Sequence, residues 1–189
     1  MKHLIGQLSL GLLFGCGEEV SNLAKPQEAA PASRHLRHEV EGDTITITGC
    51  HKKASGSLII PRTIEGKSVA KIQRLAFRDC IRLTKVTIPD SVTSIGDYCF
   101  VDCSSITSMT IPDSVDSIGW GAFRNCSSLT AIIFLGDTPN IVNEALTFRE
   151  SSPTIYRKSE TKGWGDTFAG RPIKLITEKR NGVSLIPEP

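Results

Sequence analysis

Hydrophobic residues recur through the middle of the chain at a fixed spacing of 23 residues. Each repeat contains an alternating apolar and polar segment, a polar corner, a second short apolar piece, and a segment with one phenylalanine and one cysteine. The aligned positions form five columns: Ile72, Ile95 and Ile118; Phe77, Phe100 and Phe123; Cys80, Cys103 and Cys126; Leu83, Ile106 and Leu129; and Val86, Met109, Ile132 and Ile155. A fixed period in this range is typical of a solenoid, in which each repeat packs on its neighbours.

A single repeat predicts its own local structure. In "LTKVTI" (Leu83–Ile88), Val86 and Ile88 alternate with polar residues, which predicts a strand with one buried face. Pro89 ends that strand because it has no backbone N–H for a ladder, and the "DS" after it favours a turn. The following "CFVDC" predicts a single tight helical turn that directs its phenylalanine and second cysteine inward.

The first repeat is longer than the others. Pro61 and Pro89 are 28 residues apart, whereas Pro89 and Pro112 are 23 apart. The five extra residues fall within "TIEGKSV", between two predicted strands. We expect them to form a loop outside the stacked core, where insertions are tolerated.

Two stretches resemble a known repeat family nearly position for position. They are "SVTSIGDYCFVDCSSITSMTIPDS" (Ser91–Ser114) and "SVDSIGWGAFRNCSSLTAIIF" (Ser114–Phe134), and they resemble the rungs of BspA-like leucine-rich repeat proteins. The flanks resemble the family as well: "DTITITGC" is similar to its opening hairpin, and "GWGDTFAGRPIKLI" (Gly163–Ile176) to a closing segment. The resemblance covers about residues 39–176.

The resemblance implies a right-handed leucine-rich-repeat solenoid dominated by β-structure. Each rung of about 23 residues would consist of a strand and a short helical turn. An N-terminal hairpin would precede three full rungs, and a fourth strand at Thr154–Tyr156 would precede a C-terminal cap. Trp164 and Phe168 are expected in the core of that cap, because the open end of the last rung must be covered.

The start of the chain has a different character. Its apolar run from Leu4 to Phe14 is shorter than the about 20 residues that cross a bilayer, and it fits a secretory signal. "LLFGC" resembles the lipobox of bacterial lipoproteins, which implies a signal peptide over residues 1–15 and acyl chains on Cys16. An ordinary signal peptide cut elsewhere, or an apolar start without function, remains an alternative.

The expected domain organisation follows from these segments. Residues 16–38 would comprise the acylated cysteine and a flexible tether rich in Ala, Pro and charge. Residues 39–176 would form the leucine-rich-repeat domain with its caps, and residues 177–189 a loosely ordered tail.

Charge and motif content argue against several functions. Lys and Arg total 22 against 20 Asp and Glu, so the basic footprint of a nucleic-acid-binding protein is absent. Three of the four histidines lie in the predicted signal or tether, and no hydrolase, zincin or phosphate-loop motif is present. We therefore expect no enzyme activity, no cofactor and no small-molecule substrate.

The cysteines suit a structural role. Cys80, Cys103 and Cys126 each follow a core phenylalanine by three residues, which indicates buried thiols stacked along the solenoid. A disulfide between neighbouring rungs is the alternative. Cys99 and Cys103 lack the companions of a zinc site, so no metal is expected.

The outward strand positions are the candidate binding residues. Together with Trp120, which replaces Asp97 of the preceding rung, the candidates are Lys85, Thr87, Ser108, Thr110, Trp120, Ile133 and Tyr156. Extended solenoid faces bind partners, although Ser and Thr also simply suit exposed strands. Trp120 is either a binding hot spot or packs on Arg74, Asp97 or the cap.

These observations predict a non-catalytic cell-envelope lipoprotein. Its repeat face would mediate protein–protein interaction or adhesion, with a glycan as the second choice of ligand, and its lipid would anchor it in the membrane. Gly17 after Cys16 is not acidic, which favours the outer membrane or cell surface. The alternative is a structural spacer that self-assembles at the surface without a diffusible ligand.

Overall fold

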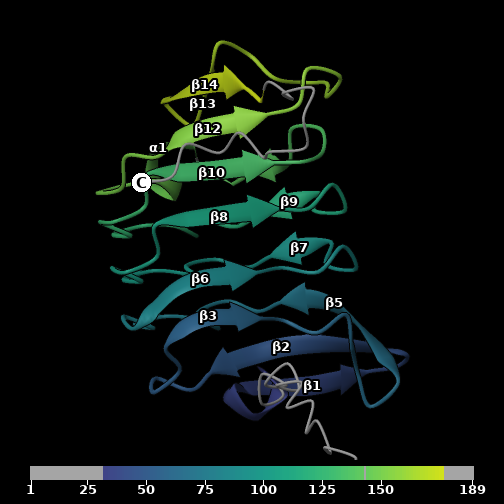
Figure 1. The fold of residues 1–189 in the computed structure, drawn as a ribbon. Helices are drawn as coiled ribbons and strands as arrows, with labels where there is room; N and C mark the ends of the chain where they lie inside the picture. Colours follow the sequence, from purple (N-terminus) through teal and green to yellow (C-terminus); the bar gives the residue numbers. More distant parts are fainter. Residues whose placement is uncertain (1–31, 143, 177–189) are drawn as a thin grey trace, which may run out of the picture.

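Two sheets run along the length of the solenoid in the computed structural model, which describes residues 32–142 and 144–176 (Figure 1). The first sheet has the order β1 (Leu36–Glu41), β2 (Thr44–Cys50), β5 (Lys67–Ile72), β7 (Ser94–Ile95), β9 (Ser117–Ile118) and β11 (Asn140–Ile141), with β4 (Thr63–Ile64) beside β5. The second has the order β13 (Thr167–Phe168), β14 (Arg171–Leu175), β12 (Thr154–Arg157), β10 (Ala131–Phe134), β8 (Ser108–Ile111), β6 (Leu83–Thr87) and β3 (Gly56–Ile59). Two short helices, η1 (Ala32–His35) and α1 (Glu144–Thr147), complete the described elements.

The register confirms the columns predicted from the sequence. In the second sheet, parallel pairing aligns Val86 with Met109, Met109 with Ile132, and Ile132 with Ile155. In the first sheet, Ile72 pairs with Ile95, and Ile95 with Ile118. The chain therefore repeats as a β-dominated solenoid with a rung of 23 residues.

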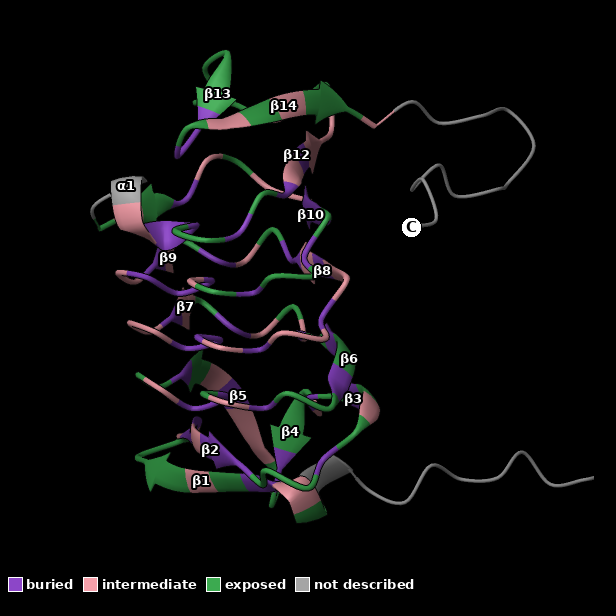
Figure 2. Cartoon of the chain, turned by 90° about the vertical axis from the view of Figure 1, so that its left-hand side faces the viewer, coloured by how far each residue is buried: buried purple, intermediate pink, exposed green. Residues whose placement is uncertain are grey.

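A ladder of phenylalanines fills the space between the two sheets. Phe77, Phe100, Phe123 and Phe148 stack on one another, with ring centroids 4.9, 5.7 and 5.6 Å apart along the series. None of the four exposes more than 1% of its surface. Figure 2 shows buried segments recurring from rung to rung along the solenoid. A single rung could not bury such rings, so the core exists only through stacking.

The predicted helical turn in each rung is wrong in its backbone conformation. The segments around Phe77 and Phe100 consist of successive turns, closed by bonds such as Arg78 N–H to Leu75 O at 3.1 Å. Every second backbone amide in these segments donates to the next rung instead, as Phe77 N–H does to Cys99 O at 2.9 Å. An amide that pairs with the next rung cannot also close an α-helical bond. Within the described residues, only the last rung contains an α-helical turn, α1.

Two of the three repeat cysteines, Cys103 and Cys126, donate their thiols to the rung before them. Cys103 Sγ lies 3.0 Å from Phe77 O, and Cys126 Sγ lies 3.0 Å from Phe100 O. In the next rung Ser151 takes this position, and its hydroxyl donates to Phe123 O at 2.7 Å. The thiols are therefore hydrogen-bond donors as well as core filling, which the spacing alone did not predict.

Hairpins modify the N-terminal end of the solenoid. β1 and β2 pair antiparallel as predicted, but β1 begins at Leu36, so the ordered chain extends into the segment expected as tether. The inserted residues of the first repeat form β4, which pairs antiparallel with β5. The expected loop is thus a short hairpin, which turns at Glu65 and Gly66 with φ values of 52° and 77°.

The C-terminal cap agrees with the prediction. β12 occupies Thr154–Arg157, and β13 and β14 form an antiparallel pair beyond it. Phe168 is 5% exposed and lies 4.9 Å from Trp164 between ring centroids. Both rings also contact Phe134 of β10, at 5.1 and 5.0 Å, so they cover the end of the core.

Gly96 marks a close approach between rungs. A Cβ placed there would lie 2.5 Å from the backbone nitrogen of Arg74, and the neighbouring backbone of Gln73 is nearly as close. Gly119 stands at the equivalent position of the next rung and meets the backbone of Asp97. The glycine after the isoleucine in each "SIG" is therefore needed for rung stacking.

Replacing Gly96 with alanine should destabilise the protein by roughly 1–3 kcal/mol, because a methyl group there forces two rungs apart. The free energy of unfolding in urea measures the effect. Gly165→Ala is the control, since its Cβ would meet only Thr167 O at 3.7 Å. Equal losses for the two variants would contradict the steric explanation.

Replacing Cys103 with alanine should cost about 1–2 kcal/mol of unfolding free energy, because a buried donor and some core volume are lost. Cys103→Ser should retain more stability, since Ser151 makes the same bond in its own rung. Thermal unfolding of both variants measures the difference. If the two melt alike, the thiol acts only as filling.

Candidate partner-binding surface

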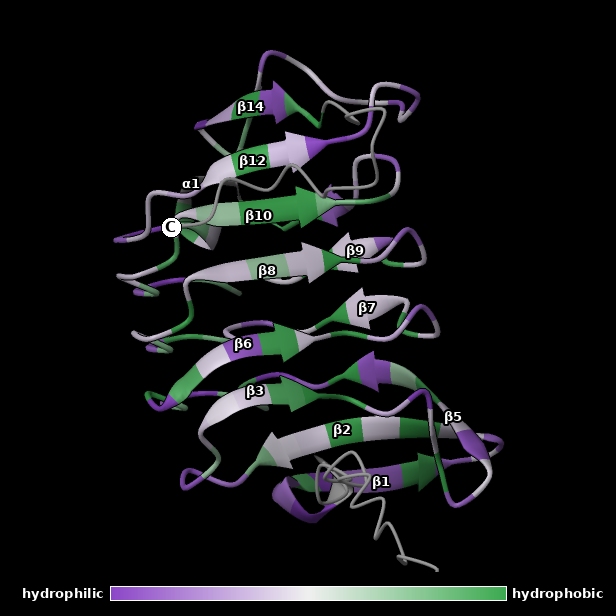
Figure 3. Ribbon diagram, viewed as in Figure 1, coloured by the Kyte–Doolittle hydropathy of each residue, from purple (hydrophilic) through white to green (hydrophobic). Residues whose placement is uncertain are grey.

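The outward positions of the second sheet form one continuous surface, which we call the strand face. Lys85, Ser108, Ala131 and Thr154 align in one column, and Thr87, Thr110, Ile133 and Tyr156 align in another. Figure 3 shows β3, β6, β8, β10 and β12 stacked side by side beneath this surface. The structure thus brings six of the seven predicted binding residues together.

These residues differ in how much surface they offer. Lys85 and Thr87 are exposed, whereas Ser108, Thr110 and Tyr156 are half-buried. Ile133 is only 4% exposed, although the register places it in the outward column between Thr110 and Tyr156. It therefore provides little contact area, contrary to its expected exposure.

Ile59 extends the strand face and was missed by the sequence analysis. It pairs in register with Thr87 and is 58% exposed, so it is one of the larger exposed apolar side chains of the described residues. A signal for it is present in the sequence. Ile59 stands two residues before Pro61, as Thr87 and Thr110 stand two residues before their own prolines.

Trp120 lies away from the strand face. It follows β9 of the first sheet, and its ring packs edge-on against Tyr98 with a centroid distance of 4.7 Å. Its backbone N–H donates to the Asp97 carboxylate at 2.8 Å. The ring contact with Tyr98 is one that the sequence did not indicate, and the bond to Asp97 comes from the backbone of Trp120 rather than from its side chain.

Burial favours the protonated form of the Cys99, Cys103 and Cys126 thiols. Burial raises the pKa of Cys126 to about 12, and it also raises the pKa values of Cys99 and Cys103. A hydrogen bond between the Cys50 and Cys80 thiols raises the pKa of Cys50 and lowers that of Cys80. All five cysteines of the described residues are free and buried, so they suit packing rather than nucleophilic attack.

The polar groups at the N-terminal end form local pairs. His38 Nε2 lies 3.6 Å from Glu65 Oε1, and His51 Nδ1 accepts a hydrogen bond from the backbone N–H of Lys53 at 3.4 Å.

Residues 32–142 and 144–176 contain no cluster of three or more His, Cys, Asp or Glu side chains suited to a metal. Over the same residues, no helix is long and apolar enough to cross a membrane.

Several solved bacterial proteins share this architecture. A leucine-rich repeat protein from Bacteroides capillosus aligns with a TM-score of 0.57 and 25% identity, covering 66% of this chain and 95% of that one. The leucine-rich repeat protein of T. pallidum aligns with a TM-score of 0.55 and 22% identity, covering 66% and 69%.

A third solved structure is a leucine-rich cell surface protein from Faecalibacterium prausnitzii. It aligns with a TM-score of 0.53 and 27% identity over 68% of this chain, but this covers only 36% of that protein. No curated protein sequence matches significantly.

The sequence matches a family profile over more than half of its length. Residues 55–168 match the BspA type leucine-rich repeat region in six copies. These residues include β3 through β13, and therefore the strand face and the phenylalanine ladder. Leucine-rich repeat proteins of this kind are generally interaction or surface proteins and are typically non-catalytic. This chain belongs to the BspA-type leucine-rich repeat family.

Proposed function

We propose that this chain is an envelope protein whose strand face binds another protein. The observation that carries the proposal is the in-register outward column of Ile59, Thr87 and Thr110, which presents an exposed apolar side chain beside two hydroxyl groups. An exposed apolar side chain next to hydroxyl groups is suited to a protein partner, which supplies both apolar and polar contacts.

The size of the strand face favours moderate affinity. Five parallel strands of four or five residues each support it. This is a small area compared with the roughly 800 Å² per partner of a stable complex. Adhesion through many weak contacts by neighbouring copies on a surface is therefore the mode of action we propose.

Attachment to the envelope through Cys16 is the second part of the proposal. Cys16 lies outside the described residues, so its support is the "LLFGC" sequence and the apolar run before it. The F. prausnitzii relative is a cell surface protein, which is consistent with a surface location for this chain. Lipid attachment would leave the strand face free to meet a partner.

Changing Thr87 and Thr110 together to glutamate should weaken partner binding about tenfold or more, which corresponds to about 1.4 kcal/mol or more. The new carboxylates would lose solvation in the contact without gaining a partner. The measurement starts with capture by the purified full chain from envelope extracts and matrix-protein arrays. The dissociation constant of the identified partner is then measured by biolayer interferometry.

The control for this pair is Thr63→Glu with Thr93→Glu, two exposed threonines associated with the first sheet. This control should bind as the native chain does. If the strand-face pair also binds normally, the site lies elsewhere. If the native chain captures nothing and instead self-associates in sedimentation, the structural-spacer alternative replaces the proposal.

Cys16→Ala should abolish lipid attachment, because the acyl chains have no other thiol at the lipobox. Metabolic labelling with radioactive palmitate should mark the native chain and not the variant, and the variant should move from the membrane fraction to the soluble fraction. An unlabelled native chain with an unchanged location for the variant would refute the anchor.

A further inference from the structure

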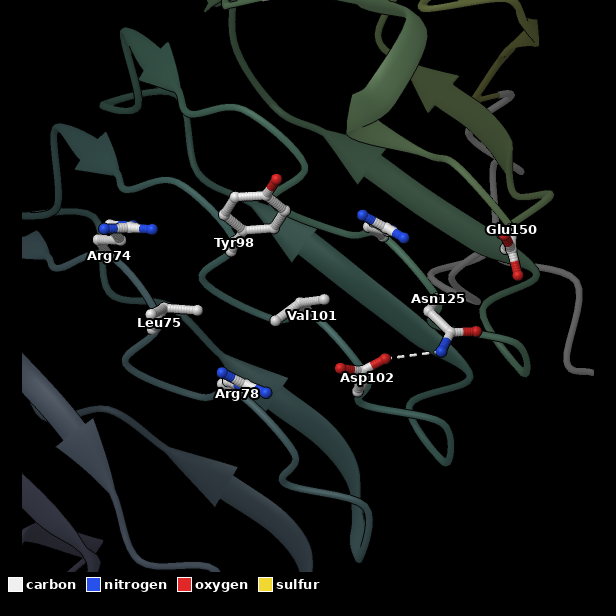
Figure 4. A pocket seen from close by; sticks show the side chains of 9 residues that line it. Arg74, Leu75, Arg78, Tyr98, Val101, Asp102, Asn125 and Glu150 are labelled. Carbon is white, nitrogen blue, oxygen red and sulfur yellow. Dashed lines mark hydrogen bonds between the residues drawn. The ribbon is translucent and has the colours of Figure 1, made fainter.

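A hollow with a volume of about 320 Å³ opens on a third side of the solenoid, where the turns after β5, β7 and β9 stack. We call it the turn hollow. Its lining includes Arg74, Arg78, Tyr98, Val101, Asp102 and Arg124. Figure 4 shows Tyr98, Val101 and Asp102 along one turn, with Arg74 and Arg78 on the neighbouring turn. No residue of the strand face contributes to it.

The repeat itself places two arginines around an apolar floor. Arg78, Val101 and Arg124 are each 23 residues apart and therefore occupy the same position in three successive turns. Bonds from Asp79 N–H to Val101 O and from Asp102 N–H to Arg124 O, at 3.0 and 3.1 Å, hold these turns in register. Arg78 and Arg124 are thus two rungs apart, roughly 10 Å from backbone to backbone.

Val101 forms the floor without belonging to the central core. It is 8% exposed and is not part of the main hydrophobic cluster. An apolar floor between two cationic side chains provides burial for a small apolar group and ion pairing on either side of it.

The three arginines of the turn hollow outnumber its two acidic residues, Asp102 and Glu150. Asp102 accepts a hydrogen bond from Asn125 at 2.6 Å, and Glu150 pairs with Arg149 at 3.6 Å. Arg78 pairs with the adjacent Asp79 at 3.2 Å. Among the described residues, the side chains of Arg74 and Arg124 have neither a hydrogen-bond acceptor nor an ion-pair partner.

One wall of the turn hollow is held rigidly. Tyr98 has a φ of 51°, a left-handed conformation that costs a residue with a side chain roughly 1–2 kcal/mol. Its ring lies over Gly121, where a Cβ would be 2.8 Å from Tyr98 Cε1, and against the edge of Trp120. A preformed wall lowers the entropy cost of binding, and it gives Trp120 a supporting role.

We propose that the turn hollow binds an acidic peptide segment of a partner protein. One carboxylate of the segment pairs with Arg124, and a second pairs with Arg74 and Arg78 on the other side of the floor. An apolar side chain between the two carboxylates rests on Val101 against Tyr98. Arginine forks match carboxylates in geometry. In an extended peptide, two acidic residues on the same face as an apolar residue between them are four positions apart, or about 13–14 Å, and the flexible arginine side chains reach across the difference.

A glycan fits this hollow less well. Neutral sugar hydroxyls would leave the guanidinium charges of Arg74 and Arg124 without the counter-charges that carboxylates supply. The inference is independent of the strand-face proposal, because the two surfaces share no residue and each is tested by different variants.

The test uses the purified full chain and two fluorescent peptides, EELEE and its uncharged counterpart QQLQQ, in an anisotropy titration at low and physiological salt. We expect EELEE to bind at least about tenfold more tightly than QQLQQ, and its affinity to fall as salt rises, because the contact is electrostatic. Equal binding of the two peptides, or no binding of EELEE, would overturn the proposal.

Variants locate the contact. Arg124→Gln and Arg74→Gln should each weaken EELEE binding about fivefold to tenfold, whereas Arg82→Gln should stay within about twofold. Arg82 is a matched control because it is exposed and lies outside the hollow. Unchanged circular dichroism spectra would confirm that each variant is folded.

Two results would contradict the proposal that the turn hollow binds an acidic peptide. An equal loss for Arg82→Gln would reduce the effect to net charge. A heparin fragment that displaces EELEE and binds more tightly than it would assign the hollow to a sulfated glycan and overturn the peptide proposal.

Discussion

Parallel hydrogen bonding from one rung to the next is the constraint on which the whole structure depends. It acts in both sheets and also in the turns, where Phe77 and Phe100 donate their amides to the following rung. Because adjacent rungs must stay about 4.8 Å apart on every side, each position along the chain lies directly over its equivalent in the next repeat. This geometry explains why equivalent residues recur every 23 positions in the sequence.

The same spacing decides which residues the core accepts. Flat rings such as Phe100 and Phe123 stack almost parallel, with planes 3° apart, and a small donor such as Cys126 or Ser151 satisfies the carbonyl of the rung before it. Gly96 is required where the backbones come closest. The core is thus a set of columns, and its stability depends on every rung keeping the same register.

Residues outside the buried columns can vary from rung to rung, so they can determine which partner binds. On the second sheet these are the outward residues, with Ile59 and Thr87 adjacent in one column. On the turns they are Arg78, Val101 and Arg124, where the same position in three rungs carries two charges and an apolar side chain. Both candidate surfaces arise from differences between rungs within a uniform backbone.

The sequence alone determined the solenoid, its rung length, the inward columns and the caps at Trp164 and Phe168, because periodic burial leaves a direct trace in residue order. Only the tertiary structure decided the conformation of the turns, the thiol bonds to the carbonyls, the low exposure of Ile133 and the turn hollow. Each of these depends on what the neighbouring rung presents across a gap of about 4.8 Å. Tyr98 and Trp120, for example, lie on neighbouring rungs and contact each other across this gap. The residue pattern of a single rung does not predict such a contact.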